Sequence, residues 1–214
     1  MRPILIIAVL MLMAVTGHGL DLDDRLLAFV EQKFGADARE RLENWEQLVL
    51  AERDTPEPLQ VQRVNDFFNE RDFVSDLAHW GESDYWATPV EFLATDAGDC
   101  EEYANAKYMS LRALGIPDEK LRVTYVNARH LNQAHMVLAY YPEPDAEPLI
   151  LDNLVDTIQP ASQRTDLDPV YSFNGTDLWL SRESNKQRDK RIGTADELAQ
   201  WNHLRDRMMR ITGK

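Results

Sequence analysis

The sequence predicts an α+β protein in which helices come first and a further helix then packs on an antiparallel sheet. Apolar residues recur at steps of three and four up to residue 114. After residue 120 the period changes to two, in runs rich in β-branched and aromatic residues. The turn-forming segment 142–148 separates two of these runs and predicts a hairpin.

The first nineteen residues have the pattern of a signal peptide. One arginine precedes an apolar run from Ile4 to Val15, which is too short to span a bilayer, and small residues follow. We expect residues 1–19 to be removed, residues 20–214 to form a single domain, and the mature protein to reside in the periplasm. An uncleaved N-terminal anchor is the alternative, because no clear Ala-x-Ala cleavage site is present.

Two helical regions are predicted next. Residues 23–50 have helical periodicity with a break at Gly35, and a further helix follows the turn predicted at 54–58. Their apolar stripes are interpreted as core: Leu26, Leu27, Val30, Phe34, Leu42, Trp45, Leu48, Val49, Val61, Val64, Phe67 and Phe68.

The segment "AGDCEEYANAKYMSLRALGIP" (97–117) predicts the most clearly bounded helix. Asp99 and Glu102 have the spacing of an N-terminal capping box. Gly115, with a proline two residues later, is typical of a helix end. The only cysteine of the chain, Cys100, therefore lies in the first turn, on the inward face.

Strands are predicted over 121–127, 134–141 and 148–154, and a further strand or hairpin around Asn174-Gly175. A last helix is predicted near the C-terminus from the stripe Trp201, Leu204, Met208 and Ile211.

The net charge of −14 argues against a nucleic-acid-binding protein, because phosphates attract basic surfaces. It fits a soluble protein that can bind cations, although solvation alone explains most of these acids. After the leader, no stretch of the sequence is long and apolar enough to span a membrane.

Cys100 stands among Asp99, Glu101 and Glu102, whose charges raise the cost of forming a thiolate. The start of a helix has the opposite effect, because its unpaired N–H groups favour a thiolate. A lone cysteine in an exported chain cannot form an internal disulfide. Cys100 is therefore either buried and inert or a nucleophile.

A cysteine nucleophile needs a base and a group that orients the base. His135 opens a predicted strand, whereas His130 lies in the preceding loop and is expected to be exposed. If the hairpin closes near residues 143 and 144, Asp152 lies directly opposite His135 and can orient its imidazole. A one-residue slip would bring Asn153 there instead. An ordinary structural hydrogen bond is the alternative to a catalytic pair.

The segments "DYWATPVEFLATDAGDCEEYANAKYMSLRALGIP", "AHMVLAYY" and "LILDNL" resemble the bacterial transglutaminase-like cysteine proteinases, in particular the periplasmic LapG-type proteases. The resemblance covers most of residues 84–160. It implies a papain-like or transglutaminase-like fold. It also implies Cys100 as nucleophile, His135 as general base and acid, and Asp152 as the orienting group.

The same resemblance implies calcium dependence through Asp99, Glu101 and Glu102, although the family often has Asp where this chain has Glu102. Carboxylate oxygens suit calcium, whereas zinc usually takes several Cys or His ligands. A bound cation would offset the effect of the acids on the thiolate. Helix capping and solvation are the alternative use of these acids.

The resemblance further implies an endopeptidase that cleaves a large surface adhesin near its N-terminal region, at an Ala-Ala bond, and so releases cells from biofilm. It implies control by an inner-membrane receptor that senses cyclic di-GMP. A transglutaminase-type acyl transferase and a calcium-dependent binding module without catalysis are the alternatives. For the oxyanion we expect the Cys100 backbone N–H, with Trp86 Nε1 as a candidate second donor.

Overall fold

The computed structural model describes residues 20, 22–181 and 189–212. The predicted signal peptide, residues 1–19, lies outside the described residues. Within those ranges no helix has the length and apolar character needed to cross a membrane.

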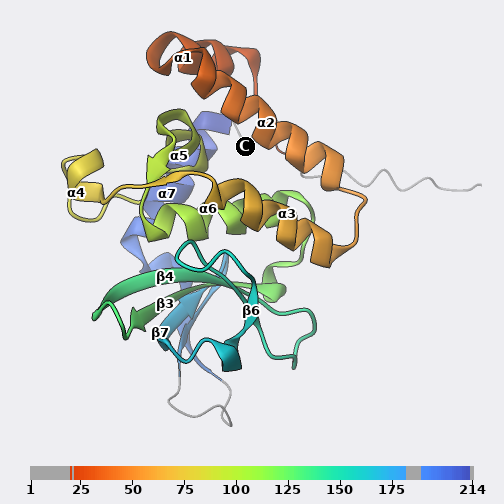
Figure 1. Cartoon of the computed structure of the whole chain (residues 1–214), viewed down its shortest axis with the longest axis vertical. Helices are drawn as coiled ribbons and strands as arrows, with labels where there is room; N and C mark the ends of the chain where they lie inside the picture. The colour runs from red at the N-terminus through yellow and green to blue at the C-terminus, as the bar shows by residue number, and fades with distance from the viewer. Residues whose placement is uncertain (1–19, 21, 182–188, 213–214) are drawn as a thin grey trace, which may run out of the picture.

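The N-terminal half of the chain is helical, as predicted (Figure 1). Gly35 separates the first two helices because it adopts a φ of 96°, which glycine tolerates, and its N–H caps the preceding helix at the Glu31 carbonyl. The helices before the cysteine are α1 (Asp24–Phe34), α2 (Ala36–Glu52), α3 (Glu57–Asn69), α4 (Asp76–His79) and α5 (Pro89–Thr95).

Helix α6 (Cys100–Ala113) begins and ends where the sequence predicted. The capping box of Asp99 and Glu102 is present, and Gly115 follows the helix with a φ of 96°. This helix packs against α3 and against the sheet, so it lies between α3 and the sheet (Figure 1). The predicted C-terminal helix is α7 (Ala199–Thr212).

One sheet contains seven strands in the order β6-β5-β4-β3-β7-β8-β9, and every neighbouring pair is antiparallel. The predicted hairpin around Asn174-Gly175 joins two of its strands. Its members are β3 (Leu121–Ala128), β4 (Gln133–Tyr140), β5 (Leu149–Leu151), β6 (Gln159–Pro160), β7 (Leu167–Phe173), β8 (Asp177–Leu180) and β9 (Lys190–Thr194). A separate parallel pair joins β1 (Asp72–Phe73) to β2 (Ala97–Gly98). Short 3-10 turns cover Asp118–Lys120, Ala161–Gln163 and Ala195–Glu197.

Side chains of β4 alternate between two apolar clusters. Met136, Leu138 and Tyr140 belong to the main core beneath the helices. Val137 and Ala139 belong to a smaller cluster with Val126 of β3 and Ile150 of β5, on the other face. The sheet is therefore covered by helices on one face, with α6 seated on β4.

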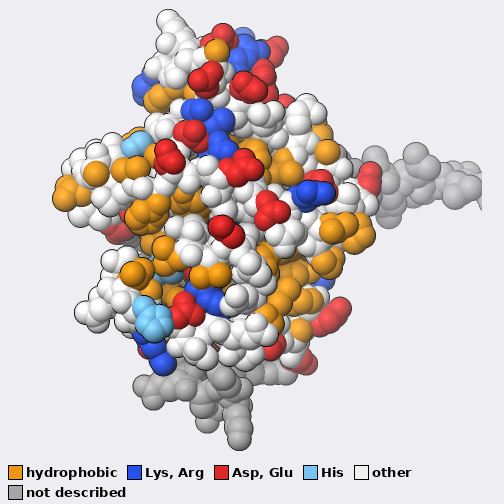
Figure 2. Space-filling model, viewed as in Figure 1, with side chains coloured by type: hydrophobic (Ala, Val, Ile, Leu, Met, Phe, Trp, Pro, Cys, Tyr) orange, Lys and Arg blue, Asp and Glu red, His pale blue; other side chains and the backbone are white. Residues whose placement is uncertain are grey.

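On the face drawn in Figure 2, acidic and basic side chains are interspersed between apolar ones. The surplus of acid is therefore not gathered into one patch over this face.

Candidate active site

The start of α6 is held by two residues that flank Cys100. Glu102 is 1% exposed, and both of its carboxylate oxygens accept backbone N–H groups, Ala87 N at 2.7 Å and Asp99 N at 2.9 Å. Gly98 allows this close packing, because a Cβ there would lie 2.9 Å from the Glu102 Cβ. The first turn of α6 is thereby fixed before any ligand is considered.

A cluster of carboxylates surrounds this turn. Oxygens of Asp76, Asp84 and Glu101 can approach one ligand position, as can those of Asp76, Asp99 and Glu102. The Asp76 Oδ1 and Asp99 Oδ1 atoms are buried and lack a hydrogen-bond partner among the described residues. Within the described residues, none of the five acids forms an ion pair with Lys or Arg. These acids are Asp76, Asp84, Asp99, Glu101 and Glu102.

Burial and mutual repulsion raise the pKa values of Asp76, Glu101 and Glu102. Burial, reinforced by Asp99, raises the pKa of Glu101 to about 9. Burial, reinforced by Asp99 and then Asp84, raises the pKa of Asp76 to about 6. The pKa of Glu102 is likewise raised by burial and by its acidic neighbours. The cluster therefore favours the uptake of positive charge, whether protons or a cation.

Orphaned buried oxygens and an all-carboxylate donor set fit a hard cation such as calcium. Asp76 and Asp84 were not among the residues predicted from the sequence. Asp76 begins the short helix α4 and Asp84 lies in the irregular segment after it, 24 and 16 positions before Cys100, and no spacing rule connects them to it. A tertiary contact brings Asp76 to the start of α6, where its backbone N–H donates to Asp99 Oδ2 at 3.2 Å.

Cys100 is partly exposed, and its thiol donates to Glu101 Oε2 at 3.1 Å. Burial raises the pKa of this thiol, and Glu101 and then Asp99 raise it further. The backbone amide of Met136 acts in the opposite direction and lowers the pKa of the thiol. The acids thus have the effect on the sulfur that the sequence predicted.

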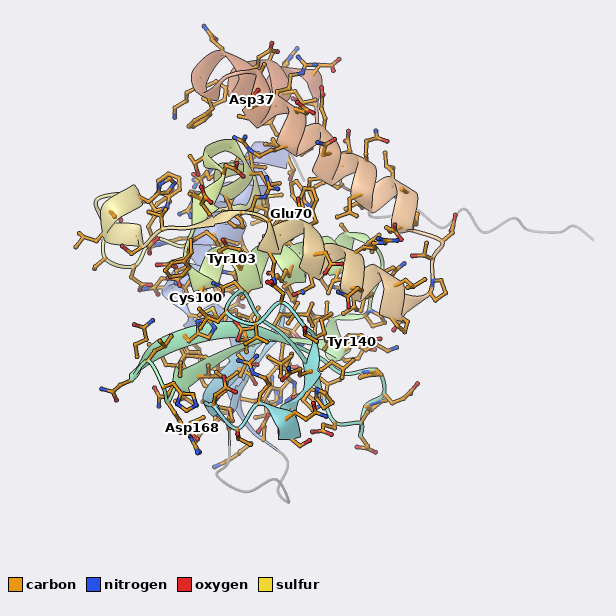
Figure 3. All side chains as sticks on the ribbon, in the orientation of Figure 1. Asp37, Glu70, Cys100, Tyr103, Tyr140 and Asp168 are labelled. Atoms are coloured by element: carbon orange, nitrogen blue, oxygen red, sulfur yellow. The ribbon has the colours of Figure 1, made fainter. Side chains whose placement is uncertain are left out.

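The Met136 amide also locates the sulfur relative to the sheet. Strand β5 ends at Leu151, opposite Leu138, so the first residues of β4 have no strand on that side in the described chain. The amide that acts on the Cys100 sulfur belongs to Met136, the residue after His135, at this open edge. Figure 3 shows Cys100 above the sheet.

His135 and Asp152 form a buried pair, with 2.7 Å between Nε2 and Oδ1. The two residues are 3% and 1% exposed. Although burial alone raises the pKa of Asp152, its bond to His135 and the donors Leu154 N and Arg164 lower that pKa to about 2. Because Asp152 is ionised, Nε2 donates to it, which leaves Nδ1 as the nitrogen that can accept a proton.

The predicted register was wrong by two residues. Leu138 pairs with Leu151, so Val137 rather than His135 lies opposite position 152. A shift of two keeps every side chain on its face, and Asp152 reaches His135 diagonally. The alternative partner Asn153 does not bond to His135, and its Oδ1 is buried without a partner among the described residues.

Arg164 was missed by the sequence analysis. It is 4% exposed and donates from Nη2 to Asp152 Oδ2 at 2.7 Å and to Asp166 Oδ2 at 2.8 Å. It lies outside any strand or α-helix, in a segment whose sequence carries no periodic signal. Two other expectations can be compared with the structure: His130 is exposed, as expected, and Trp86 Nε1 already donates to Asp84.

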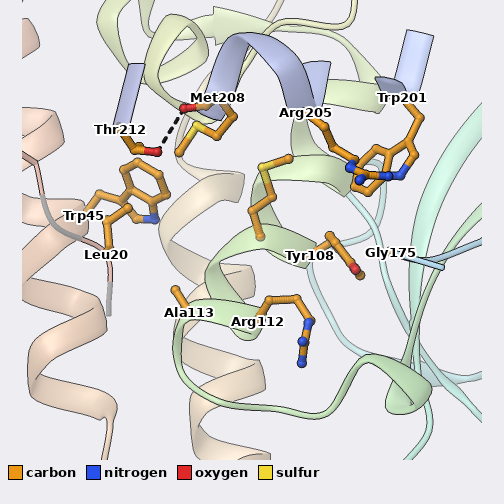
Figure 4. A pocket seen from close by; sticks show the side chains of 11 residues that line it. Leu20, Trp45, Tyr108, Arg112, Ala113, Gly175, Trp201, Arg205, Met208 and Thr212 are labelled. Carbon is orange, nitrogen blue, oxygen red and sulfur yellow. Dashed lines mark hydrogen bonds between the residues drawn. The ribbon is translucent and has the colours of Figure 1, made fainter. Parts of the chain in front are cut away.

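Two cavities border the described residues. One of about 280 Å³ adjoins the Asp152 loop and is lined by Leu131, Leu154 and Asp166, together with Ala128 and His130. A larger one of about 360 Å³ lies at the opposite end of α6, between Tyr108, Arg112, Trp201 and Met208 (Figure 4). The larger cavity is therefore separate from the site around Cys100.

Comparison with protein families matches residues 32–186 to the bacterial transglutaminase-like cysteine proteinases. The chain is also similar to LapG of Legionella pneumophila, with 40% identity and a TM-score of 0.75 over 89% of this chain and 99% of that one. EGTA-treated LapG of the same organism is 40% identical to the chain, with a TM-score of 0.76 over 89% of this chain and 99% of that one. Calcium-bound LapG of that organism is 41% identical, with a TM-score of 0.72 over 86% of this chain and 98% of that one. No curated protein matches the chain.

The chain therefore belongs to the bacterial transglutaminase-like cysteine proteinases and has their mixed fold of helices and antiparallel sheet.

Proposed function

We propose that this protein is a calcium-dependent cysteine endopeptidase of the periplasm with the triad Cys100, His135 and Asp152. The observation that carries the proposal is the buried His135–Asp152 bond, which stands next to Met136, whose amide lowers the pKa of the Cys100 thiol. Family membership supports a peptidase, and the chain contains only one cysteine to serve as its nucleophile.

Each triad residue has a defined task. His135 takes the thiol proton of Cys100, and the thiolate attacks the peptide carbonyl, so that an S–C bond forms. His135 then protonates the leaving amine as the C–N bond breaks. In the second half-reaction it takes a proton from water, which attacks the thioester carbonyl. The C–S bond then breaks, the acid is released, and His135 returns the proton to the Cys100 sulfur. Asp152 holds the imidazole tautomer and stabilises the imidazolium that forms.

The oxyanion of each tetrahedral intermediate needs fixed donors. The Cys100 N–H suits this task, because a helix start leaves its first N–H groups without intrahelical partners. Trp86 Nε1 is a poor second donor, since it is already bonded to Asp84 at 2.9 Å.

Asp99 and Glu101 would hold the calcium ion, with Asp76 and Asp84 as further donors. Bound there, calcium would neutralise the charges that raise the pKa of the Cys100 thiol. Glu102 was also predicted as a ligand. Its two oxygens already accept backbone N–H groups, which supports a structural role for it instead.

For the substrate we propose a large surface adhesin, cut near its N-terminal region at an Ala-Ala bond so that cells leave the biofilm. We further propose control by an inner-membrane receptor that senses cyclic di-GMP and sequesters the protease. These proposals rest on the sequence resemblance to LapG-type proteases and on the similarity to Legionella pneumophila LapG.

The test is a mass-spectrometric digest of the N-terminal region of a candidate adhesin, with wild type and Cys100→Ala, in calcium and in EGTA. We expect cleavage by wild type in calcium alone. Ammonia loss with crosslinking would indicate a transglutaminase instead, and an unchanged substrate would indicate a binding module. Cleavage by folded Cys100→Ala would remove the nucleophile assignment, whereas full activity in EGTA with verified calcium loss would remove only the metal.

A further inference from the structure

Lys107 is a buried lysine in the middle of α6, two turns from the cysteine, and only 1% of its surface is exposed. Its Nζ donates to Asn65 Oδ1 at 2.9 Å and to Asn69 Oδ1 at 2.5 Å. Both asparagines belong to α3, and both acceptors are neutral amides. Lys107 forms no ion pair within the described part of the chain.

The two asparagines connect this lysine to the segment that follows β5. Asn69 Nδ2 donates to the Asp152 carbonyl at 2.8 Å and to Asp156 Oδ1 at 3.0 Å. Asn65 Nδ2 donates to the Asp156 carbonyl at 2.9 Å. Because each amide oxygen accepts from Lys107, each amide nitrogen is directed at the segment 152–156.

A lysine at this position is costly to the fold. Burial lowers the pKa of Lys107 to about 7, although Asp152, Asp156 and Asp66 favour its charged form. An apolar side chain of similar length would fill the same space without removing a charge from water. Packing alone therefore does not explain why a lysine is found here.

We propose that Lys107, acting through Asn65 and Asn69, is a positioning residue that fixes the backbone of Asp152 and thereby the orientation of His135. Asp152 is then held at both ends. Arg164 and the Leu154 amide hold its carboxylate, while Asn69 holds its carbonyl. The inference rests on the proposed function, since it assigns Asp152 the role of orienting the catalytic imidazole.

The most informative variant is Asn69→Asp. An aspartate of the same shape still accepts from Lys107, but its second oxygen faces the Asp152 carbonyl and Asp156 Oδ1, where a donor is needed. A merely structural role for Lys107 predicts an unchanged site, because the lysine gains an ion pair. Lys107→Met removes the other end of the network, and Lys120→Met, which breaks a lysine contact to Glu57 elsewhere, is the matched control.

We expect Asn69→Asp in calcium to lower kcat on the adhesin fragment about 100-fold with KM nearly unchanged, as a small misplacement of a catalytic group does. The rate of Cys100 alkylation by iodoacetamide, followed by mass spectrometry against pH, provides a readout without substrate. Wild type and Lys120→Met should show a reactive thiolate below pH 7, and Asn69→Asp and folded Lys107→Met should lose it.

Folded Asn69→Asp with wild-type kcat and the wild-type alkylation profile would overturn the positioning role and leave the triad intact. If Cys100 of the wild type in calcium is not alkylated as a thiolate below pH 7, the proposed function is overturned, and this inference with it. Circular dichroism and the thermal midpoint verify that each variant is folded.

Discussion

The two sides of Cys100 differ in how their charges are matched. On one side, Asp76, Asp84 and Asp99 stand with two glutamates, and no Lys or Arg in the described chain pairs with them. On the other side, Asp152 is buried, and Arg164 and His135 compensate its charge. We refer to the cluster of five acids as the acid side, and to Asp152 with Arg164 and His135 as the base side.

The pKa values of the two sides move in opposite directions for this reason. The pKa of Glu101 is raised to about 9, first by burial and then by Asp99. The pKa of Asp152 is lowered to about 2 despite burial, because His135 and Arg164 favour its ionised form. The base side is therefore complete within the protein, whereas the acid side, in our proposal, is completed by a cation from outside.

The largest expected effect comes from breaking the base side with Arg164→Met. The change leaves the Asp152 and Asp166 carboxylates without their shared partner. Loss of one partner from a buried pair costs about 3–5 kcal/mol, so we expect a destabilisation of that order in urea unfolding. We also expect a roughly 100-fold loss of peptidase activity, because Asp152, without its bond from Arg164, holds His135 less firmly in place.

The matched control for this variant is Arg129→Met, which breaks the exposed ion pair with Asp168. Exposed pairs contribute little to stability because water screens them, so the control should remain close to wild type. Equal effects of the two variants would contradict the matched base side.

The second effect is the stabilisation of the acid side by calcium. Calcium at about 100 times its Kd should raise the free energy of unfolding by about 2.7 kcal/mol. Because protons compete with the ion for the same carboxylates, the increase should be larger at pH 8 than at pH 5. Thermal unfolding in calcium and in EGTA at both pH values measures it, and an equal or reversed dependence on pH would argue against the site.

In EGTA the two sides also predict opposite pH windows. The folded-state pKa values of Asp76 and Glu101 are raised to about 6 and about 9, so the folded protein binds more protons than the unfolded chain. Stability from these groups is present at acid pH and is lost as pH rises through those values. Asp152 contributes stability above its ordinary pKa of 3.8, which is lost as pH falls towards 2.

A third, smaller effect is expected from Gly98→Ala. The new Cβ would lie 2.9 Å from Glu102 and 3.0 Å from Phe92, so the first turn of α6 must shift. Overpacking of this kind costs about 1–3 kcal/mol. A fully stable and active Gly98→Ala would show that the turn tolerates displacement, contrary to the packing described here.

The smallest expected effect changes sign with calcium. Above pH 9, where Glu101 is ionised in the absence of calcium, Glu101→Gln removes a repelling charge, so in EGTA it should stabilise the protein by about 1 kcal/mol, the scale of a typical single substitution. In calcium it should destabilise relative to wild type, because a ligand is lost. The thermal midpoints in EGTA and in calcium measure both effects, and the exposed Glu70→Gln is the control. Destabilisation in both solutions would contradict the repulsion between Glu101 and the neighbouring acids.

The sequence predicted those parts of the fold that depend on local signals. The start of α6 followed from the spacing of Asp99 and Glu102, and its end from Gly115. The face of Asp152 was predicted, but its register was not, because the connection from residue 141 to 148 is too long to fix where the hairpin closes.

The remaining site residues depend on tertiary contacts. Asp76, Asp84 and Arg164 lie in short or irregular segments, where hydrophobic periodicity gives no information. Lys107 is different, since it lies three residues after Ala104 and four before Leu111, on the inward face of a helix that the sequence predicted. A charged residue at such a position is a signal that could have identified it.

The most direct test of the account is the rate of Cys100 alkylation by iodoacetamide, measured against pH in calcium and in EGTA. The account predicts a reactive thiolate below pH 7 in calcium. In EGTA it predicts that reaction begins only at much higher pH, because burial, Glu101 and Asp99 then raise the pKa of the thiol. Identical profiles in the two solutions, with calcium binding and its removal verified, would contradict the claim that the ion on the acid side activates the sulfur.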